Sequence, residues 1–177
     1  GALRNVRFNL SHCSGLVCLA VALSREVGVD SEVVERRGRM MQIARRFFTA
    51  GEAACLEAMA SEEERAVAFT RLWTLKEAYV KARGLGISGV GLHNFAFTGF
   101  GGQGKGTLGV DLEGAEDSAA RWQFAVLDIS PRHAASLAVS VPEGRGGADV
   151  VVIRTVPLAG VPDTLLDART HQVLTSV

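Results

Sequence analysis

The sequence predicts an α+β fold, in which an antiparallel sheet packs against one long helix. Two observations support this class. Residues 62–82 carry a broad apolar face among charged residues, as a long helix does, and residues 94–156 contain short segments in which apolar and polar residues alternate with the period of a strand. The chain of 177 residues is long enough for one domain with a hydrophobic core or for two small subdomains.

The first expected elements are two strands. Residues 15–23, GLVCLAVAL, are almost entirely apolar, and residues 27–32, VGVDSE, follow after a break at 24–26. Two short strands joined by a tight turn are most simply arranged as a hairpin. We therefore expect residues 15–23 to pair with residues 27–32.

Helices are expected next. Residues 35–48 place apolar side chains among arginines at a spacing close to helical, and Thr49 with Glu52 then forms the T-x-x-E pattern of a capping box. Ser61 with Glu64 repeats that pattern. One helix should begin at each box, and the second should run to about residue 82, because Gly84 and Gly86 stop it.

The remaining strands are expected in the second half of the chain. Glycine-rich and polar segments separate them, which favours antiparallel connections. The predicted strands are residues 94–100, 107–112, 122–129, 135–141 and 149–156. After residue 157 the pattern weakens, and we expect an irregular tail with at most one short helix.

Composition excludes several classes of function. Lysine plus arginine equals aspartate plus glutamate at 19 each, so the chain has no overall basic field for nucleic acid. Its three cysteines lack CxxC spacing, which argues against a disulfide framework or a zinc site and favours a reducing compartment. The apolar run at 15–23 is too short to span a bilayer and follows a polar segment, so we expect a cytoplasmic protein with no membrane partner.

Two glycine-rich motifs are better explained without a ligand. Residues 84–89, GLGISG, match GxGxxG but follow a helix, whereas a dinucleotide-binding loop follows a strand. Residues 99–105 match GxxxxGK, but Gly106 occupies the position of the Ser or Thr that binds magnesium. We interpret the first as a helix stop and the second as a hairpin turn.

A pair of acids marks the first candidate site. Asp30 and Glu32 are two residues apart in a predicted strand, so their carboxylates lie on one face. Two such carboxylates repel each other unless a cation lies between them, and Mg²⁺ prefers these oxygen ligands. The alternative is a solvated strand edge with two ordinary acids.

The long helix carries the second group. Glu77 and Lys81 are four residues apart and so share a face, and Lys76 precedes Glu77 in the chain. One carboxylate and two ammonium groups suit a metal bound to a diphosphate. The alternative is an exposed ion pair on a helix. Ser11 and His12 offer a further set of donors for a phosphate, although an isolated histidine is often structural.

Taken in order, FNLSH, GVDSE, FF and WTLKEAYVK resemble the 4'-phosphopantetheinyl transferase superfamily, Sfp type. The resemblance covers about residues 6 to 142. It implies the 4'-phosphopantetheinyl transferase fold and a holo-acyl-carrier-protein synthase activity. The phosphopantetheine arm of coenzyme A would move to a serine of an apo acyl or peptidyl carrier protein, with Mg²⁺ as cofactor and 3',5'-ADP released.

The resemblance also implies roles for individual residues. Asp30, Glu32 and Glu77 would bind the metal, and Glu77 would help to deprotonate the carrier serine. Lys76 and Lys81 would hold phosphates, while Ser11 and His12 would contact the 3'-phosphate of coenzyme A. The catalytic set is thus Glu77, Lys81 and Asp30.

The chain departs from the family pattern in three places. Cys13 follows the histidine where Ser or Thr is usual, and Ser31 replaces an apolar residue between the two acids. We expect Ser31 to point away from the metal face and to have little effect. Sfp-type enzymes also resemble two similar halves, and here FNLSH occurs within the first residues.

This organisation predicts residues 1–26 as a segment linking to a missing N-terminal half, and residues 27–177 as the catalytic subdomain with a tail at about 157–177. Self-association or pairing with such a half would then complete the site. The alternative functions are a noncatalytic half-enzyme that binds coenzyme A or a carrier protein, and an ordinary magnesium-dependent phosphotransferase.

Overall fold

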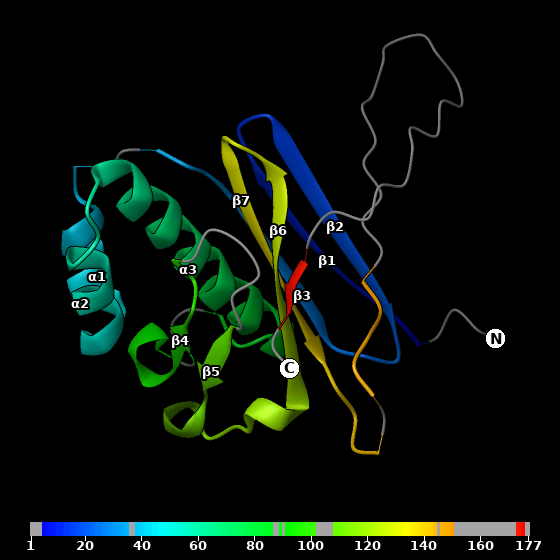
Figure 1. Cartoon of the computed structure of the whole chain (residues 1–177). Helices are drawn as coiled ribbons and strands as arrows, with labels where there is room; N and C mark the ends of the chain where they lie inside the picture. Colours follow the sequence, from blue (N-terminus) through cyan, green and yellow to red (C-terminus); the bar gives the residue numbers. More distant parts are fainter. Residues whose placement is uncertain are drawn as a thin grey trace, which may run out of the picture.

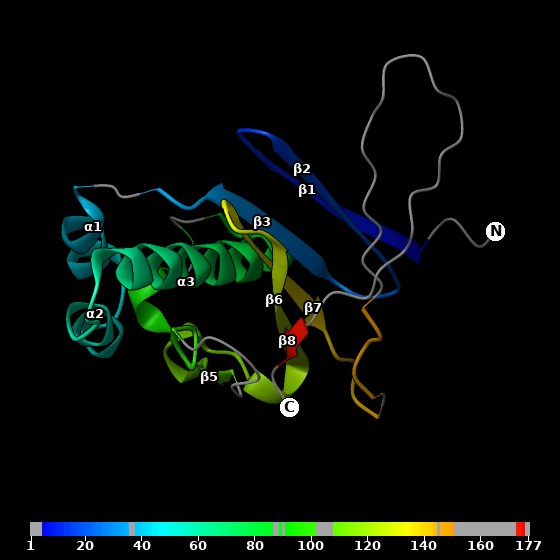
Figure 2. The same ribbon diagram turned by 45° about the horizontal axis from the view of Figure 1, so that its top comes forward.

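In the computed structural model, the long helix crosses one face of a four-stranded antiparallel sheet and a separate hairpin lies against the other face (Figures 1 and 2). The structure describes residues 5–35, 38–86, 89, 91–101, 108–144, 146–150 and 173–175; of Asp128 and residues 173–175 only the backbone is described. The sheet has the order β3 (Val27–Val33), β7 (His133–Ser140), β6 (Trp122–Ser130) and β8 (Val173–Thr175). The predicted fold class, an antiparallel sheet packed against a long helix, is confirmed.

The predicted pairing of residues 15–23 with residues 27–32 is wrong. β2 (Leu16–Leu23) instead pairs with β1 (Val6–Cys13) in an antiparallel hairpin, and β3 pairs with β7. Residues 6–13 do alternate apolar and polar side chains, which is a strand signal. β3 is buried on both faces, between α3 and the hairpin, and so belongs to the four-stranded sheet.

β1 runs along the free edge of β3 and is joined to it by side chains. Asn9 Oδ1 accepts a hydrogen bond from the Val29 N–H at 2.9 Å, and Ser11 Oγ accepts one from the Ser31 N–H at 3.1 Å. These bonds satisfy donors that an edge strand would otherwise leave unpaired. The FNLSH segment therefore positions β3 from its outer edge.

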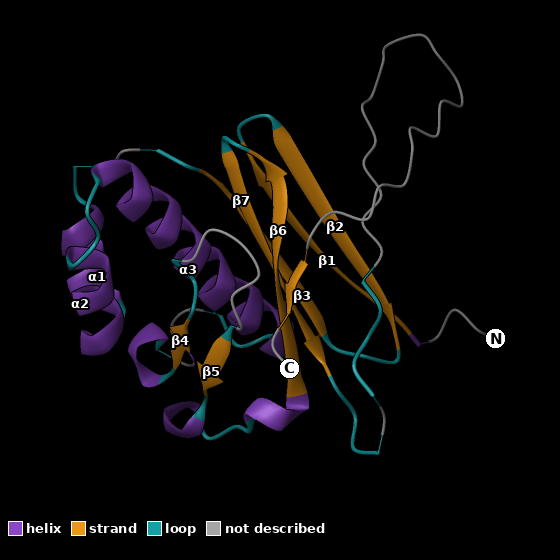
Figure 3. Cartoon of the chain, in the orientation of Figure 1, coloured by secondary structure: helices purple, strands orange, loops and turns teal. Residues whose placement is uncertain are grey.

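Three described α-helices follow β3: α1 (Met40–Phe47), α2 (Ala50–Glu57) and α3 (Glu62–Arg83). α1 and α2 lie at one end of the molecule, and α3 runs from there along the sheet (Figure 3). Thr49 and Glu52 form the predicted capping box, and Ser61 Oγ accepts from the Glu64 N–H. α3 ends at Gly84, whose φ of 66° is left-handed, so the predicted helix and its stop are confirmed. The helix expected over residues 35–48 is shorter, since it begins only at Met40.

The predicted strands 94–100 and 107–112 are present in shortened form as β4 (Ala96–Thr98) and β5 (Gly109–Asp111), which form a separate two-stranded sheet. The turn predicted between them lies largely outside the described residues, as do most of the strand predicted at 149–156 and the tail. A short 3-10 helix at Leu92–Asn94 precedes β4, and two more, at Glu113–Ala115 and Ala119–Arg121, follow β5. No described helix combines the length and the apolar character needed to cross a bilayer.

One glycine allows the close contact between sheet and helix on which the site depends. A Cβ atom added at Gly28 would lie 2.1 Å from the Ala78 carbonyl oxygen and 2.5 Å from the Ala82 nitrogen, both in the backbone of α3. Only a residue without a side chain fits there. β3 and α3 therefore approach at the turns of α3 that carry Glu77 and Lys81.

Candidate active site

The site is built where β3 meets α3. Asp30 is 6% exposed, and its Oδ1 lies 2.7 Å from the Lys81 ammonium nitrogen. Lys81 also donates to the Val29 carbonyl oxygen at 3.2 Å. The structure thus brings together Asp30 and Lys81, which the sequence placed in two separate motifs.

Ser11 joins this pair from β1. Its hydroxyl donates to Asp30 Oδ1 at 3.0 Å and accepts from the Ser31 N–H at 3.1 Å. The Lys81 ammonium and the Ser31 hydroxyl each lie 3.3 Å from Ser11 Oγ as further donors. Ser11 is therefore part of the site, held within a closed set of protein contacts.

Among the residues that the structure describes, two buried carboxylate oxygens have no hydrogen-bond partner. They are Asp30 Oδ2 and Glu77 Oε1. Burial raises the pKa of Glu77 to about 7, with the nearby Asp30 charge adding to this and the Lys81 ammonium opposing it. A buried carboxylate oxygen without a partner is costly, so this arrangement favours a bound cation.

The two acids fit a magnesium ion. Mg²⁺ is held by one or two carboxylates and completes its shell with waters and substrate phosphates. Among the residues that the structure describes, no three His, Cys, Asp or Glu side chains are grouped as a ready metal site. Asp30 and Glu77, each with a buried oxygen that lacks a partner, are the residues that would hold the ion, and their role as ligands stays a prediction. Glu32 lies close enough to raise the pKa of Glu77, and its place as a ligand stays a prediction.

Lys76 is not brought to this group. Its ammonium is fully buried and lies 2.9 Å from Glu52 Oε2, and it donates to the carbonyl oxygens of Leu92 at 2.8 Å and Phe95 at 2.6 Å. These three oxygen atoms account for the three protons of the Lys76 ammonium. Burial lowers the pKa of Lys76 to about 8, while Glu52 acts in the opposite direction. This position gives no support to the predicted phosphate contact and makes Lys76 a core ion-pair partner.

His12 and Ser11 point to opposite sides of β1. His12 is exposed on the outer face of the hairpin, whereas Ser11 is buried against β3. Successive side chains of a strand alternate in this way. The structure therefore does not bring the two residues to one phosphate, and the predicted role of His12 stays a prediction.

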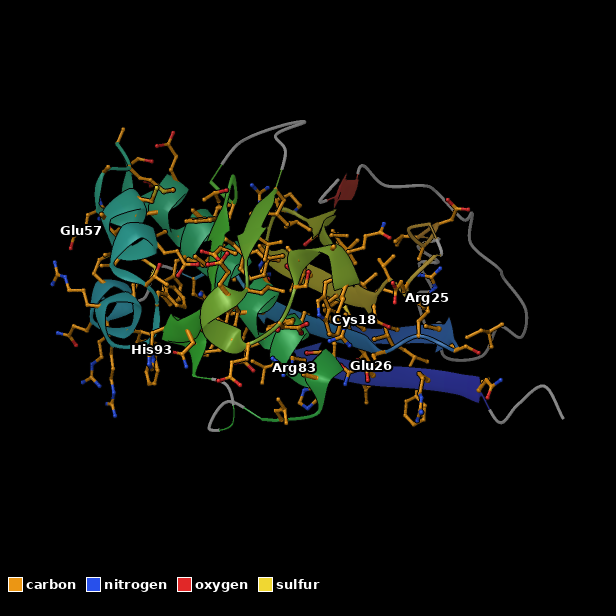
Figure 4. All side chains as sticks on the ribbon, turned by 90° about the horizontal axis from the view of Figure 1, so that it is seen from below. Cys18, Arg25, Glu26, Glu57, Arg83 and His93 are labelled. Atoms are coloured by element: carbon orange, nitrogen blue, oxygen red, sulfur yellow. The ribbon has the colours of Figure 1, made fainter. Side chains whose placement is uncertain are left out.

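Sequence reasoning missed two contributors to the site. Asn9 holds β3 through Val29, and Ser31, expected to have little effect, places its hydroxyl 3.3 Å from Ser11 Oγ. The alternation of residues 6–13 could have identified β1, but no local signal shows that β1 lies beside β3. Viewed from below, Glu57 lies among the helices at one end of the molecule and Cys18 lies among the strands (Figure 4).

The chain is similar to several curated proteins. It is 40% identical over 81 residues to the 4'-phosphopantetheinyl transferase HetI of Nostoc, covering 46% of this chain and 34% of HetI. It is 44% identical over 77 residues to AcpT of Salmonella typhimurium, covering 44% and 40%, and 33% identical over 87 residues to a 4'-phosphopantetheinyl transferase of Bacillus subtilis, covering 49% and 37%. The matched part spans between about a third and two-fifths of these relatives.

Two solved structures are also similar. The holo-acyl-carrier-protein synthase of Thermotoga maritima matches with a TM-score of 0.46 and 24% identity, over 65% of this chain and 62% of that one. The Bacillus anthracis synthase, solved in complex with coenzyme A (3',5'-ADP), matches with a TM-score of 0.47 and 18% identity, over 65% and 94%.

A family model provides the assignment. The model described as the 4'-phosphopantetheinyl transferase superfamily matches residues 26–140, which include β3, all three α-helices and the strands β4 to β7. This range contains Asp30, Glu77 and Lys81. The chain belongs to the 4'-phosphopantetheinyl transferase superfamily.

Proposed function

We propose that this chain transfers the phosphopantetheine arm of coenzyme A to a serine of an apo acyl or peptidyl carrier protein, with Mg²⁺ as cofactor. The observation that carries the proposal is the pair of buried, partnerless oxygens, Asp30 Oδ2 and Glu77 Oε1, beside the Lys81 ammonium. Two buried carboxylates beside a lysine suit a metal-bound diphosphate. The names of the curated relatives support the same reaction.

In this reaction the carrier serine oxygen forms a bond to the β-phosphorus of coenzyme A. The bond from that phosphorus to the bridging oxygen breaks, and 3',5'-ADP leaves with the electron pair. When bound, Mg²⁺ neutralises charge on the diphosphate oxygens. Glu77 accepts the serine proton in this proposal, directly or through a water.

Lys81 has a double role in the proposal. Its ammonium lies 2.7 Å from Asp30 Oδ1 and its side chain is 30% exposed, so we place it at the edge of the space in which a diphosphate would lie. The lysine orients one metal ligand and adds positive charge beside the reacting phosphate.

The proposed partners are coenzyme A and the carrier protein, in a pathway of polyketide, nonribosomal peptide or fatty acid synthesis in the cytoplasm. We also propose that the outer face of the β1–β2 hairpin contacts a second folded half or a second copy of this chain. Six large apolar side chains on that face are more than half exposed, which supports such a contact: Phe8, Leu10, Val17, Leu19, Val21 and Leu23.

Intact mass measurement tests the activity. The chain is incubated with coenzyme A, Mg²⁺ and several apo carrier proteins, and a gain of one phosphopantetheine unit on a carrier is expected. Glu77→Gln should abolish the gain, whereas Glu62→Gln, an exposed acid in the first turn of α3, should retain it.

No gain with any carrier would contradict the transferase and favour the noncatalytic alternative. That alternative predicts binding of coenzyme A or of a carrier by this chain without transfer, which calorimetry would detect.

A further inference from the structure

We infer that Ser11, supported by Ser31, is a positioning residue that fixes the Asp30 carboxylate for the metal, and that its hydroxyl does not contact a phosphate. This inference rests on the proposed function. It differs from the role that the family resemblance implies for Ser11, and it gives a role to Ser31, where the chain departs from the family pattern.

The hydrogen bonds of Ser11 are the first argument. A serine hydroxyl has one proton to donate and two lone pairs to accept with. The proton is given to Asp30 Oδ1 at 3.0 Å, and the Ser31 N–H occupies one acceptor position at 3.1 Å. The other two neighbours of Ser11 Oγ, the Lys81 ammonium and the Ser31 hydroxyl, are donors as well and share the remaining acceptor position. A phosphate oxygen needs a donor, and Ser11 has no second proton to offer.

Burial is the second argument. Ser11 is 6% exposed and Ser31 is 2% exposed, so both hydroxyls lie beneath the surface between β1 and β3. His12, the neighbour of Ser11, is exposed on the other side of β1. A phosphate reached by His12 would therefore lie on the side of the strand away from Ser11.

The state of Asp30 is the third argument. Both contacts to its carboxylate are made at Oδ1, by Lys81 at 2.7 Å and by Ser11 at 3.0 Å, while Oδ2 is buried without a partner. The terminal torsion of an aspartate is broad, so a carboxylate held by one donor can turn. Two donors on Oδ1 fix the plane of the Asp30 carboxylate and leave Oδ2 for a cation.

The backbone of β3 and Ser31 complete the arrangement. The Ser31 N–H and hydroxyl both donate to Ser11 Oγ, so the hydroxyl proton of Ser11 is directed away from them and toward Asp30. Outer hydrogen-bond partners of this kind typically change metal affinity about 10- to 100-fold when they are removed.

A matched pair of variants tests the inference. Ser11→Thr keeps the hydroxyl, whereas Ser11→Val has nearly the same shape as Ser11→Thr but no hydroxyl. Any steric cost of the larger side chain is therefore nearly the same in the two variants. Two quantities are measured for each variant: Mn²⁺ affinity, from the electron paramagnetic resonance of the free ion, and 3',5'-ADP affinity in EDTA, by calorimetry.

We expect Ser11→Val to bind Mn²⁺ about 10- to 100-fold more weakly than Ser11→Thr, with equal affinity for 3',5'-ADP. Equal Mn²⁺ affinities would overturn the inference. So would a loss of 3',5'-ADP affinity in Ser11→Val with Mn²⁺ affinity retained, because that result would assign Ser11 to the phosphate.

Two further variants keep the test decisive if the larger side chains prevent folding. Ser11→Ala removes the hydroxyl without adding atoms and should show the same selective loss of Mn²⁺ affinity, and Ser31→Ala should show a smaller one. If the unmodified chain bound no Mn²⁺, the metal site of the proposed function would fail together with the inference. A loss of Mn²⁺ affinity in the Ser11 variants alone, with the unmodified chain still binding Mn²⁺, is a different result and supports the inference.

Discussion

Glu77 is an acid whose protonation is balanced near neutral pH. Its side chain is buried on α3, and burial raises its pKa from 4.5 to about 7. Between these two values the folded chain keeps a proton that the unfolded chain has released. The contribution of Glu77 to stability therefore falls as the pH rises through this window, and its cost is complete above pH 7.

This shift predicts a pH-dependent effect of Glu77→Gln. The variant should match the unmodified chain in unfolding free energy near pH 4 and should be more stable at pH 8, by about 3 kcal/mol at most. Urea denaturation of both proteins across this range measures the difference. Added Mg²⁺ should stabilise only the unmodified chain at pH 8, and equal stability at every pH would contradict the raised pKa of Glu77.

A second prediction at the scale of one residue concerns the contribution of Lys76 to stability. Removing one partner of a buried ion pair leaves an uncompensated charge, so Lys76→Met should cost about 3–5 kcal/mol of unfolding free energy through Glu52. The matched control is Arg45→Met. Arg45 and Glu57 form an exposed pair with side chains 64% and 46% exposed, so this change should cost less than about 1 kcal/mol.

Chemical denaturation compares the two losses. Similar losses for Lys76→Met and Arg45→Met would contradict the assignment of Lys76 to the core.

At the scale of elements, the contact of β3 with α3 controls the site. Gly28 is the point of closest approach, because its missing side chain leaves room for the backbone at Ala78 and Ala82. The same contact places Asp30 beside Lys81. Strand and helix therefore form one functional unit although residues 34–61 separate them in the sequence.

Gly28→Ala tests this unit. The added methyl would meet helix backbone at 2.1 Å, so strand and helix must separate, and we expect a loss of about 3 kcal/mol or more with weaker Mn²⁺ binding. Gly51→Ala is the control, since a Cβ there meets nothing within 4 Å and alanine favours the helix α2. Thermal unfolding and Mn²⁺ titration of both variants provide the measurement, and an unperturbed Gly28→Ala would contradict the close packing.

At the scale of the whole molecule, the outer face of the hairpin β1–β2 is an exposed apolar surface. Its six exposed apolar residues lie on paired strands, with Phe8 opposite Val21 and Leu10 opposite Leu19. The inner face of β2, including Cys18 and Ala20, covers the sheet instead. The hairpin therefore presents apolar side chains on both of its faces.

We predict that this face causes association. The unmodified chain should show concentration-dependent sedimentation, and the double variant Leu19→Lys with Val21→Lys should sediment as a monomer with an unchanged far-ultraviolet circular dichroism spectrum. Leu85→Lys, an exposed apolar residue just after α3, should leave association unchanged. A monomeric unmodified chain at all concentrations would contradict self-association through the hairpin.

The sequence by itself determined the parts that depend on neighbouring residues. The capping box at Thr49, the extent of α3 and its stop at Gly84 follow from local hydrogen bonds and backbone preference. The identities of Asp30 and Lys81 as site residues came from the order of short motifs. These features need no information about distant contacts.

Tertiary structure alone decided which of these residues meet. Consecutive helix residues are about 100° apart, so Glu77 turns toward Asp30 while Lys76 turns to Glu52 in the core, and no local pattern says which of the two faces is which. The partner of β3 was likewise set by burial against distant strands, which is why the hairpin prediction failed. Ser11 became a partner of Asp30 only because β1 lies along the edge of β3.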